Sequence, residues 1–169
     1  MGLKVSYKSK GDGFPSMIKR LHDLDGAAIE VGVLKGESAW LASIHEYGCN
    51  IPVTDKMRKY LASQGLYLRK ETTHIHIPER SFLRTGYDKN RDDVMKKGQV
   101  LIKEVADGKM TAHGCIQAIG MELASKIKDY AIELDSPENH PFTTEQKGSS
   151  NPLVDTGDMI GGITWRESK

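Results

Sequence analysis

The stretch 77–84, Ile-Pro-Glu-Arg-Ser-Phe-Leu-Arg, constrains the fold of this chain more than any other. The alternating run 73–77 in front of it predicts a strand. That strand should stop at Pro78, which keeps the residue before it extended and cannot donate to a ladder. Ser81 is then expected to accept hydrogen bonds from the first amides of a long amphipathic helix over 82–105. We therefore predict a strand-to-helix corner.

Apolar periodicity predicts the other elements. The two longest predicted helices follow one another without a strand between them, which argues against a doubly wound parallel sheet. The expected fold class is α+β, with a small mixed or antiparallel sheet and helices packed mainly on one face. Besides the corner, helical patterns mark 15–24, 37–47, 55–63, 111–134 and the short turn 156–160, and strand patterns mark 3–7, 27–34, 51–53 and 163–165.

The whole chain, residues 1–169, is expected to form a single domain, because its length suits one hydrophobic core. Residues 50–76 interrupt the apolar periodicity of the main elements. We therefore predict that they form a hairpin-like excursion. Residues 136–152 contain three prolines and several small polar residues. That composition is typical of a long, exposed and flexible loop.

The charge balance of the chain points to no particular partner. Lys and Arg number 24 against 23 for Asp and Glu, a formal charge of +1, so no global field favours nucleic acid or a membrane surface. Cys49 and Cys115 lack a paired spacing and are expected to be reduced thiols of a cytoplasmic protein. We expect neither a leader segment nor a membrane span.

One hypothesis is a metal-dependent hydrolase that uses His74, His76 and Asp88. The two imidazoles would share one face of a strand, as a metal-binding pair can. The segment 85–88 has some likeness to the second half of a zinc-peptidase motif. However, it lies one residue too far along, which turns the Asp88 side chain about 100° around a helix. A solvent-facing strand edge, with the isoleucines directed inward, is the simpler interpretation.

A second hypothesis is a nucleic-acid-binding module in the segment 56–70. Five basic residues against one acidic residue give residues 50–70 a local charge of +4, and Tyr60 and Tyr67 are interleaved with them as in single-strand binders. A charged surface hairpin is the commoner explanation of such a pattern. The five basic residues, Lys56, Arg58, Lys59, Arg69 and Lys70, are our candidates for contact with a lumen or a partner.

The segment Asp155-Thr156-Gly157-Asp158 has some likeness to the acidic signatures of certain proteases and phosphotransferases. The local interpretation is the start of a helix. Asp155 or Thr156 would cap it, and Asp158 would lie in the first turn, where the helix dipole favours a negative charge. This second interpretation explains the residues without a catalytic role.

Three short motifs occur in a fixed order. The motifs are His-Glu-Tyr-Gly at 45–48, the corner at 77–84, and Pro-Leu-Val-Asp-Thr-Gly at 152–157. With these motifs the chain resembles, over residues 29–165, the tail-completion and neck proteins of long-tailed bacteriophages, often labelled virion morphogenesis proteins.

The resemblance implies a structural virion protein, a head–tail joining domain that forms a ring at the neck or tail and is assembled in the bacterial host cytoplasm. Its partners would be other copies, expected to number six, together with connector and tail-tube or tail-terminator proteins and, in passing, packaged DNA. It implies no enzyme activity, no cofactor and no membrane contact. Arg80 is expected to pair with Glu46 or with a backbone carbonyl. The assembly motif would comprise Glu46, Tyr47, Gly48, Pro78, Arg80, Phe82, Asp155, Thr156 and Gly157.

Overall fold

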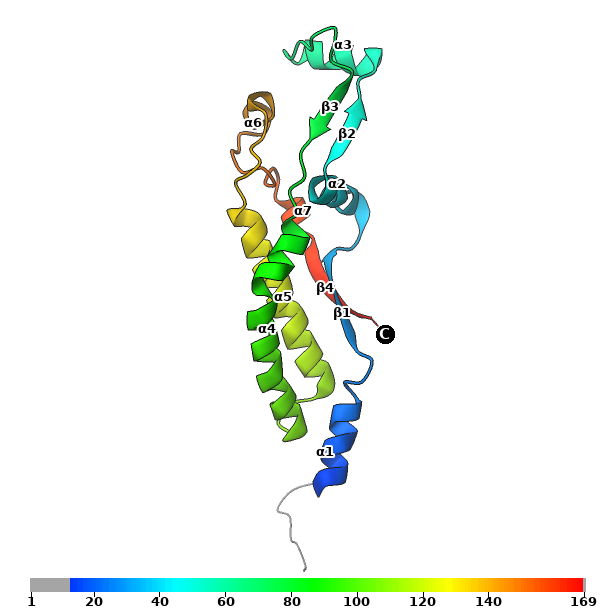
Figure 1. Ribbon diagram of the computed structural model, residues 1–169, viewed down its shortest axis with the longest axis vertical. Helices are drawn as coiled ribbons and strands as arrows, with labels where there is room; N and C mark the ends of the chain where they lie inside the picture. The colour runs from blue at the N-terminus through cyan, green and yellow to red at the C-terminus, as the bar shows by residue number, and fades with distance from the viewer. Residues whose placement is uncertain (1–12, 169) are drawn as a thin grey trace, which may run out of the picture.

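A computed structural model describes residues 13–168 of the chain (Figure 1). The fold class is α+β, as predicted. The strand predicted at 3–7 lies outside the described residues. In chain order the elements are α1 (Gly13–His22), β1 (Ala28–Val33), α2 (Gly36–Tyr47), β2 (Cys49–Pro52), α3 (Asp55–Ser63), β3 (His74–Ile77), α4 (Phe82–Ala106), α5 (Ala112–Glu133), α6 (Pro141–Lys147), α7 (Asp158–Gly161) and β4 (Ile163–Ser168).

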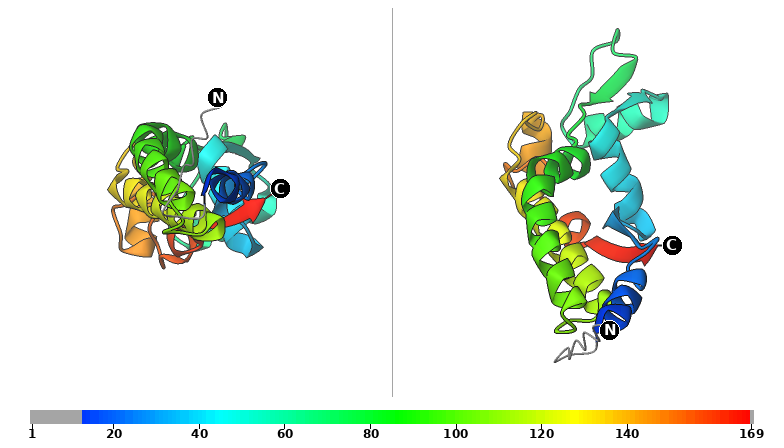
Figure 2. Two further views of the ribbon diagram at one scale, coloured as in Figure 1. Left: turned by 90° about the horizontal axis from the view of Figure 1, so that it is seen from below. Right: turned by 60° about the horizontal axis from the view of Figure 1, so that its bottom comes forward.

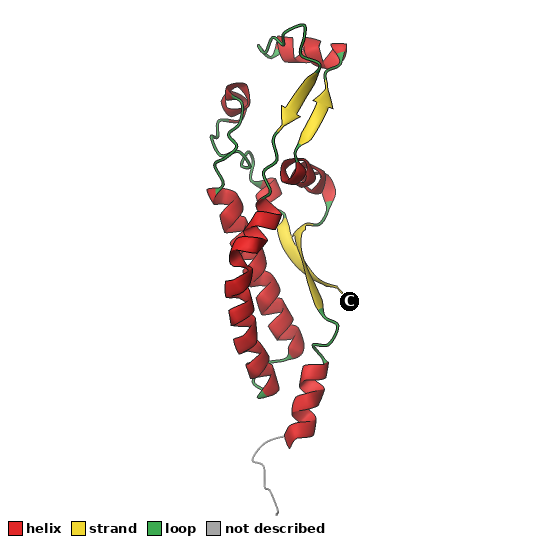
Figure 3. Cartoon of the chain, viewed as in Figure 1, coloured by secondary structure: helices red, strands yellow, loops and turns green. Residues whose placement is uncertain are grey.

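Two long antiparallel helices, α4 and α5, form the body of the molecule (Figure 3). Their lengths of 25 and 22 residues agree closely with the amphipathic patterns that predicted them. Thr111 caps α5 by accepting a hydrogen bond from the Gly114 amide at 3.1 Å. The apolar stripes of the two helices meet along their length and bury Val94, Ile116 and Leu123.

The first strand of the described chain pairs with its last strand. β1 and β4 form an antiparallel ribbon whose register runs from Ala28 opposite Ser168 to Val33 opposite Ile163. Helix α5 packs on one face of this ribbon, and α4 lies on the far side of α5 (Figures 1 and 2). The close crossing depends on Gly120, since a Cβ there would overlap the indole of Trp165. The ribbon and the helical hairpin thus share one core.

The predicted excursion is a real substructure. β2 and β3 pair antiparallel, from Cys49 opposite Ile77 to Pro52 opposite His74, and α3 lies between them at the far end of the molecule (Figure 1). Within 50–76 no residue is buried. The excursion therefore projects from the body and adds nothing to its hydrophobic core.

Residues 136–152 differ from their prediction, because they contain helix α6. His140 caps it through Nδ1, which accepts from the Phe142 amide at 3.2 Å, and Gly148 ends it in the left-handed conformation. The proline at its first position predicts a loop, but proline is equally favoured at the start of a helix. At seven residues, the helix is too short to show an apolar period.

Candidate functional site

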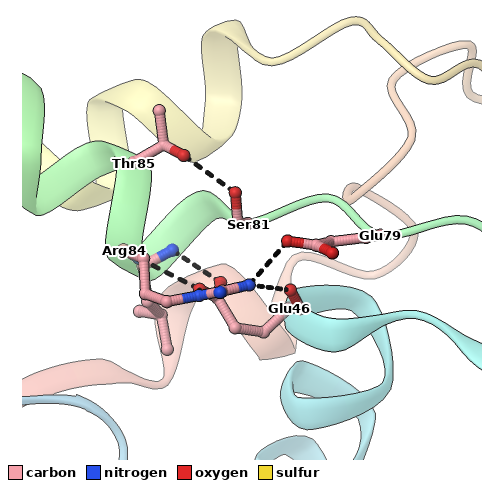
Figure 4. A network of polar contacts seen from close by, with 6 residues as sticks. Glu46, Glu79, Ser81, Arg84 and Thr85 are labelled. Carbon is pink, nitrogen blue, oxygen red and sulfur yellow. Dashed lines mark hydrogen bonds and ion pairs between the residues drawn. The ribbon is translucent and has the colours of Figure 1, made fainter.

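The candidate site is the junction at which the predicted corner meets the end of α2. Glu46, in the last turn of α2, is only 2% exposed. Its carboxylate accepts hydrogen bonds from the amides of Leu83 at 2.8 Å and Arg84 at 3.0 Å, which are otherwise unsatisfied at the start of α4 (Figure 4). Glu46 is thus the cap of α4, supplied by another helix and carrying the negative charge that a helix N-terminus favours.

The prediction that Ser81 caps α4 is wrong. Ser81 occupies the cap position, but its side chain accepts no hydrogen bond from the helix amides. Its hydroxyl instead lies 2.8 Å from the hydroxyl of Thr85, one turn along (Figure 4). The carboxylate of Glu46 occupies the place of that cap, and a charged acceptor makes a stronger hydrogen bond than a hydroxyl does.

Arg84 joins three parts of the junction. Its Nε donates to Glu46 Oε1 at 2.8 Å, and its terminal nitrogen donates to the Glu46 carbonyl at 2.9 Å and to Glu79 at 2.7 Å (Figure 4). The guanidinium also lies 4.8 Å from the centre of the Tyr47 ring, a cation–π distance. The hydrogen bond to Glu46 is the main reason that the pKa of Arg84 is raised.

Gly48 lets the two chain segments approach closely. It ends α2 with a φ of +69°, and a Cβ on it would lie 2.9 Å from both the Glu79 amide nitrogen and the Ile77 carbonyl oxygen. Ile77 is the last paired residue of β3, so the strand stops at Pro78 as predicted. Gly48 thus ends α2, and Pro78 follows the last residue of β3.

Arg80 is buried, at 3% exposure, and fastens the corner to the segment after α5. Its Nε donates to the Pro137 carbonyl at 2.7 Å, and its terminal nitrogen donates to the Glu138 carbonyl at 3.0 Å and to Asn139 Oδ1 at 3.2 Å. Burial lowers its pKa. Of the two expected partners, the backbone carbonyl is correct, whereas Glu46 pairs with Arg84 instead.

His45 lies beside Arg80 in a neutral state. Its Nδ1 is 3.4 Å from Arg80 Nη1, and since a guanidinium only donates, Nδ1 accepts and Nε2 carries the hydrogen. Burial, followed by the charges of Arg80 and Lys147, lowers the pKa of His45 to about 4. Its own carbonyl accepts from the Arg80 amide at 2.7 Å, which ties α2 to the corner a second time.

The third motif reaches the same junction. Lys147, at the end of α6, donates to the carbonyls of Asn151 at 2.6 Å, Pro152 at 3.3 Å and Val154 at 2.8 Å. Its partial burial lowers its pKa. Leu153 then enters the core, in the same buried cluster as Phe82. The structure therefore gathers the helix end, the corner and the start of the third motif, which are far apart in the sequence.

The rest of the third motif turns away from the junction. Residues 155–157 are not buried, and Gly157, at a φ of +89°, occupies the cap position of α7. The predicted position of the cap is therefore wrong, although the Thr156 hydroxyl accepts from the Asp158 amide, the first of the helix, at 3.4 Å. The Thr156 hydroxyl donates to Asp158 Oδ2 at 2.7 Å and holds the turn from outside. Together with the start of α2, this turn lines a surface groove.

The basic candidates do not behave as one set. Arg58 donates to the carbonyls of Leu68 at 3.1 Å, Arg69 at 2.8 Å and Thr72 at 2.8 Å, so its charge holds the excursion together. The other four basic side chains are exposed, and these are Lys56, Lys59, Arg69 and Lys70. Sequence reasoning did not separate the internal arginine from its neighbours.

The metal-site residues are not brought together. His74 and His76 lie on the exposed face of β3, with Ile75 and Ile77 turned inward, as the simpler interpretation predicted. Their Nδ1 atoms lie 3.0 Å from the Thr73 hydroxyl and 2.8 Å from Asn50 Oδ1. Across residues 13–168, no group of three or more His, Cys, Asp or Glu side chains is placed to hold a metal ion.

The junction's arrangement suits a structural clamp. Carboxylate, guanidinium and ammonium groups all bind helix ends or carbonyls of other segments, and in the described part of the chain no buried side-chain nitrogen or oxygen lacks a partner. None of the helices described has the length and apolarity needed to cross a bilayer. Comparison of the chain with family models, with curated proteins and with solved structures found no match.

Proposed function

We propose that this chain is a structural virion protein of a tailed bacteriophage that forms a ring, of six copies, at the head–tail junction. The observation that carries the proposal is the meeting of the three motifs at one polar junction. Those motifs, which support the resemblance to tail-completion and neck proteins, hold helix ends and carbonyls, and Glu46 and Arg80 are both buried there. Residues with these roles preserve a shape.

The projecting excursion also favours a subunit of a larger assembly. Twenty-seven residues, 50–76, fold without burying any side chain. Two tyrosines on it are exposed, Tyr60 at 63% and Tyr67 at 80%. Exposed aromatic side chains on an ordered projection are typical of a protein–protein contact. In the proposed ring the partners are neighbouring copies, the connector and tail-tube or tail-terminator proteins, with packaged DNA passing through.

The test is a phage that lacks this protein. Electron microscopy should show filled heads and finished tails that are not joined, and supplying the chain in trans should restore joined virions. Arg80→Ala should fail to restore them, because the 137–139 segment loses its hold on the corner. Joined, infectious virions in the absence of the protein would exclude the proposed function.

A further inference from the structure

The excursion is built as a rigid docking element. Thr54 caps α3 by accepting from the Met57 amide at 3.2 Å, and Arg58 ties α3 to the loop that returns to β3. These contacts fix the shape of a segment in which no residue is fully buried. Its outer surface, which we term the excursion tip, consists of the exposed side chains of Lys56, Lys59, Tyr60, Tyr67, Arg69 and Lys70.

A groove of the opposite charge lies elsewhere on the chain. It has a volume of about 470 Å³ between the start of α2 and the turn before α7. Trp40, which is 68% exposed, and Leu41 form an apolar wall. Three carboxylates line it, those of Glu37, Asp155 and Asp158, and no lysine or arginine is among its described lining residues.

The groove and the tip complement each other. The excursion 50–76 carries five basic and two acidic residues, a net charge of +3, and the groove carries three carboxylates. Lys56 and Lys59 can pair with carboxylates while Tyr60 stacks on the indole of Trp40. Aromatic contacts surrounded by charged pairs are the usual composition of a strong interface.

One molecule cannot bring its own tip to its own groove. The groove is lined by residues 37–41 in the first turns of α2 and the excursion leaves from its last turn, so residues 42–47, about 9 Å of helix, separate them. The excursion then projects beyond the end of α2 for the length of β2, about 13 Å (Figure 1). The two surfaces can meet only between separate copies.

We infer that the excursion tip of one copy docks into the Trp40 groove of the next copy. A contact between two different surfaces is heterologous, and repeated heterologous contacts close into a ring when the rotation allows it. The inference rests on the proposed function, because it names the contact that would hold the ring together. It assigns the excursion to the neighbouring subunit and the Asp155–Gly157 turn to the receiving site.

The test uses charge reversal on each surface. The tip variant is Lys56→Glu with Lys59→Glu, and the groove variant is Glu37→Lys with Asp155→Lys. Each alone should weaken self-association about a hundredfold, since like charges would then face each other. Sedimentation velocity gives the mass. Covering Trp40 should also move the tryptophan emission, to which Trp165 contributes a constant part, to shorter wavelength.

Mixing the two variants is the decisive step. In the tip variant, positions 56 and 59 and the groove are all negative, whereas in the groove variant the same two positions and the groove are positive. An equal mixture should therefore assemble in alternation although neither variant assembles alone. A matched control, Lys96→Glu with Lys103→Glu on the exposed face of α4, changes the same charge and should assemble like the unmodified chain.

The outcomes separate the inference from the proposed function. Variants that assemble as well as the unmodified chain, or a mixture that stays dissociated, overturn the docking contact. An unmodified chain that remains monomeric at its highest soluble concentration overturns it as well. Loss of nucleic-acid binding in the tip variant, with no effect of the groove variant, would assign the tip to nucleic acid. Unjoined heads and tails in the deletion phage still decide the proposed function.

Discussion

Replacing Glu46 by alanine should be among the most destabilising single changes in this chain. The carboxylate holds the amides of Leu83 and Arg84 at the start of a 25-residue helix. Hydrogen bonds to a charged acceptor contribute about 1.5–3 kcal/mol each, and the two amides, which are partly buried, would be left without this partner. Since measured cap losses fall nearer 1–2 kcal/mol, we expect a total of about 3–5 kcal/mol.

The ion pair with Arg84 adds little to that figure. The guanidinium is about half exposed and keeps its second partner, Glu79, when Glu46 is removed. Exposed pairs of this kind contribute about 0–1 kcal/mol. Glu79→Gln, which removes the exposed carboxylate from the same arginine, is therefore the matched control and should cost less than about 1 kcal/mol.

The measurement is urea unfolding followed by far-ultraviolet circular dichroism at one fixed protein concentration, because assembly would otherwise alter the apparent stability. The free energy of unfolding of Glu46→Gln should lie between those of Glu46→Ala and Glu79→Gln. The glutamine oxygen can still accept from one backbone amide, whereas its nitrogen would face the other amide, which is also a donor. Equal free energies of unfolding for Glu46→Ala and Glu79→Gln would refute the assignment of Glu46 as the cap of α4.

Three further changes test the junction and the excursion. His45 binds a proton at about pH 6.5 when unfolded but only at about pH 4 when folded, so the unfolded state gains protons first and stability should fall as pH drops from 6.5 to 4. Allowing for the partial exposure of His45, we expect the free energy of unfolding to fall by an amount on the order of 2 kcal/mol, and His45→Gln should not show this fall. Denaturation at a series of pH values measures it. Gly48→Ala should cost about 2–4 kcal/mol in thermal unfolding, because strain at positive φ adds to the backbone overlap. Gly65→Ala, at a φ of +90° with open space around its Cβ position, should cost only about 1 kcal/mol. Arg58→Ala should speed hydrogen exchange in residues 64–73 while leaving exchange in α4 and α5 unchanged, whereas Lys59→Ala should change neither.

The sequence predicts the helices and strands well where the apolar pattern is long or where glycine or proline ends the element. The stripes of α4 and α5 run for many turns, and Gly48 and Pro78 stop the elements beside them. Helix α6 was missed because seven residues cannot show a period, and its proline is compatible with either a turn or a helix start. The local sequence therefore allows either a turn or a helix here, and tertiary contacts decide between them.

The junction was predicted only in part, because its partners are far apart in the sequence. Ser81 is a plausible cap from its position alone, whereas the carboxylate that caps the helix comes from Glu46, 37 residues before Leu83. Arg80 was singled out correctly as a residue that joins two segments, but the segment it holds, 137–139, is 57 or more residues away. No pattern within one element can reveal which of several carboxylates and arginines will meet.

The position of the junction explains why shape-holding residues would matter to an assembly. Helix α2 carries the groove at its first turns and the excursion at its last, and Glu46, His45 and Gly48 fix that last turn to the corner. If α2 rotated about the junction, the groove at its first turns and the excursion beyond its last turn would move in opposite directions. A ring closes only if every copy repeats the same angle between those two surfaces. In the proposed ring, the buried clamp at the end of α2 would set that angle, and the charges of the groove and of the excursion tip would set which surfaces meet.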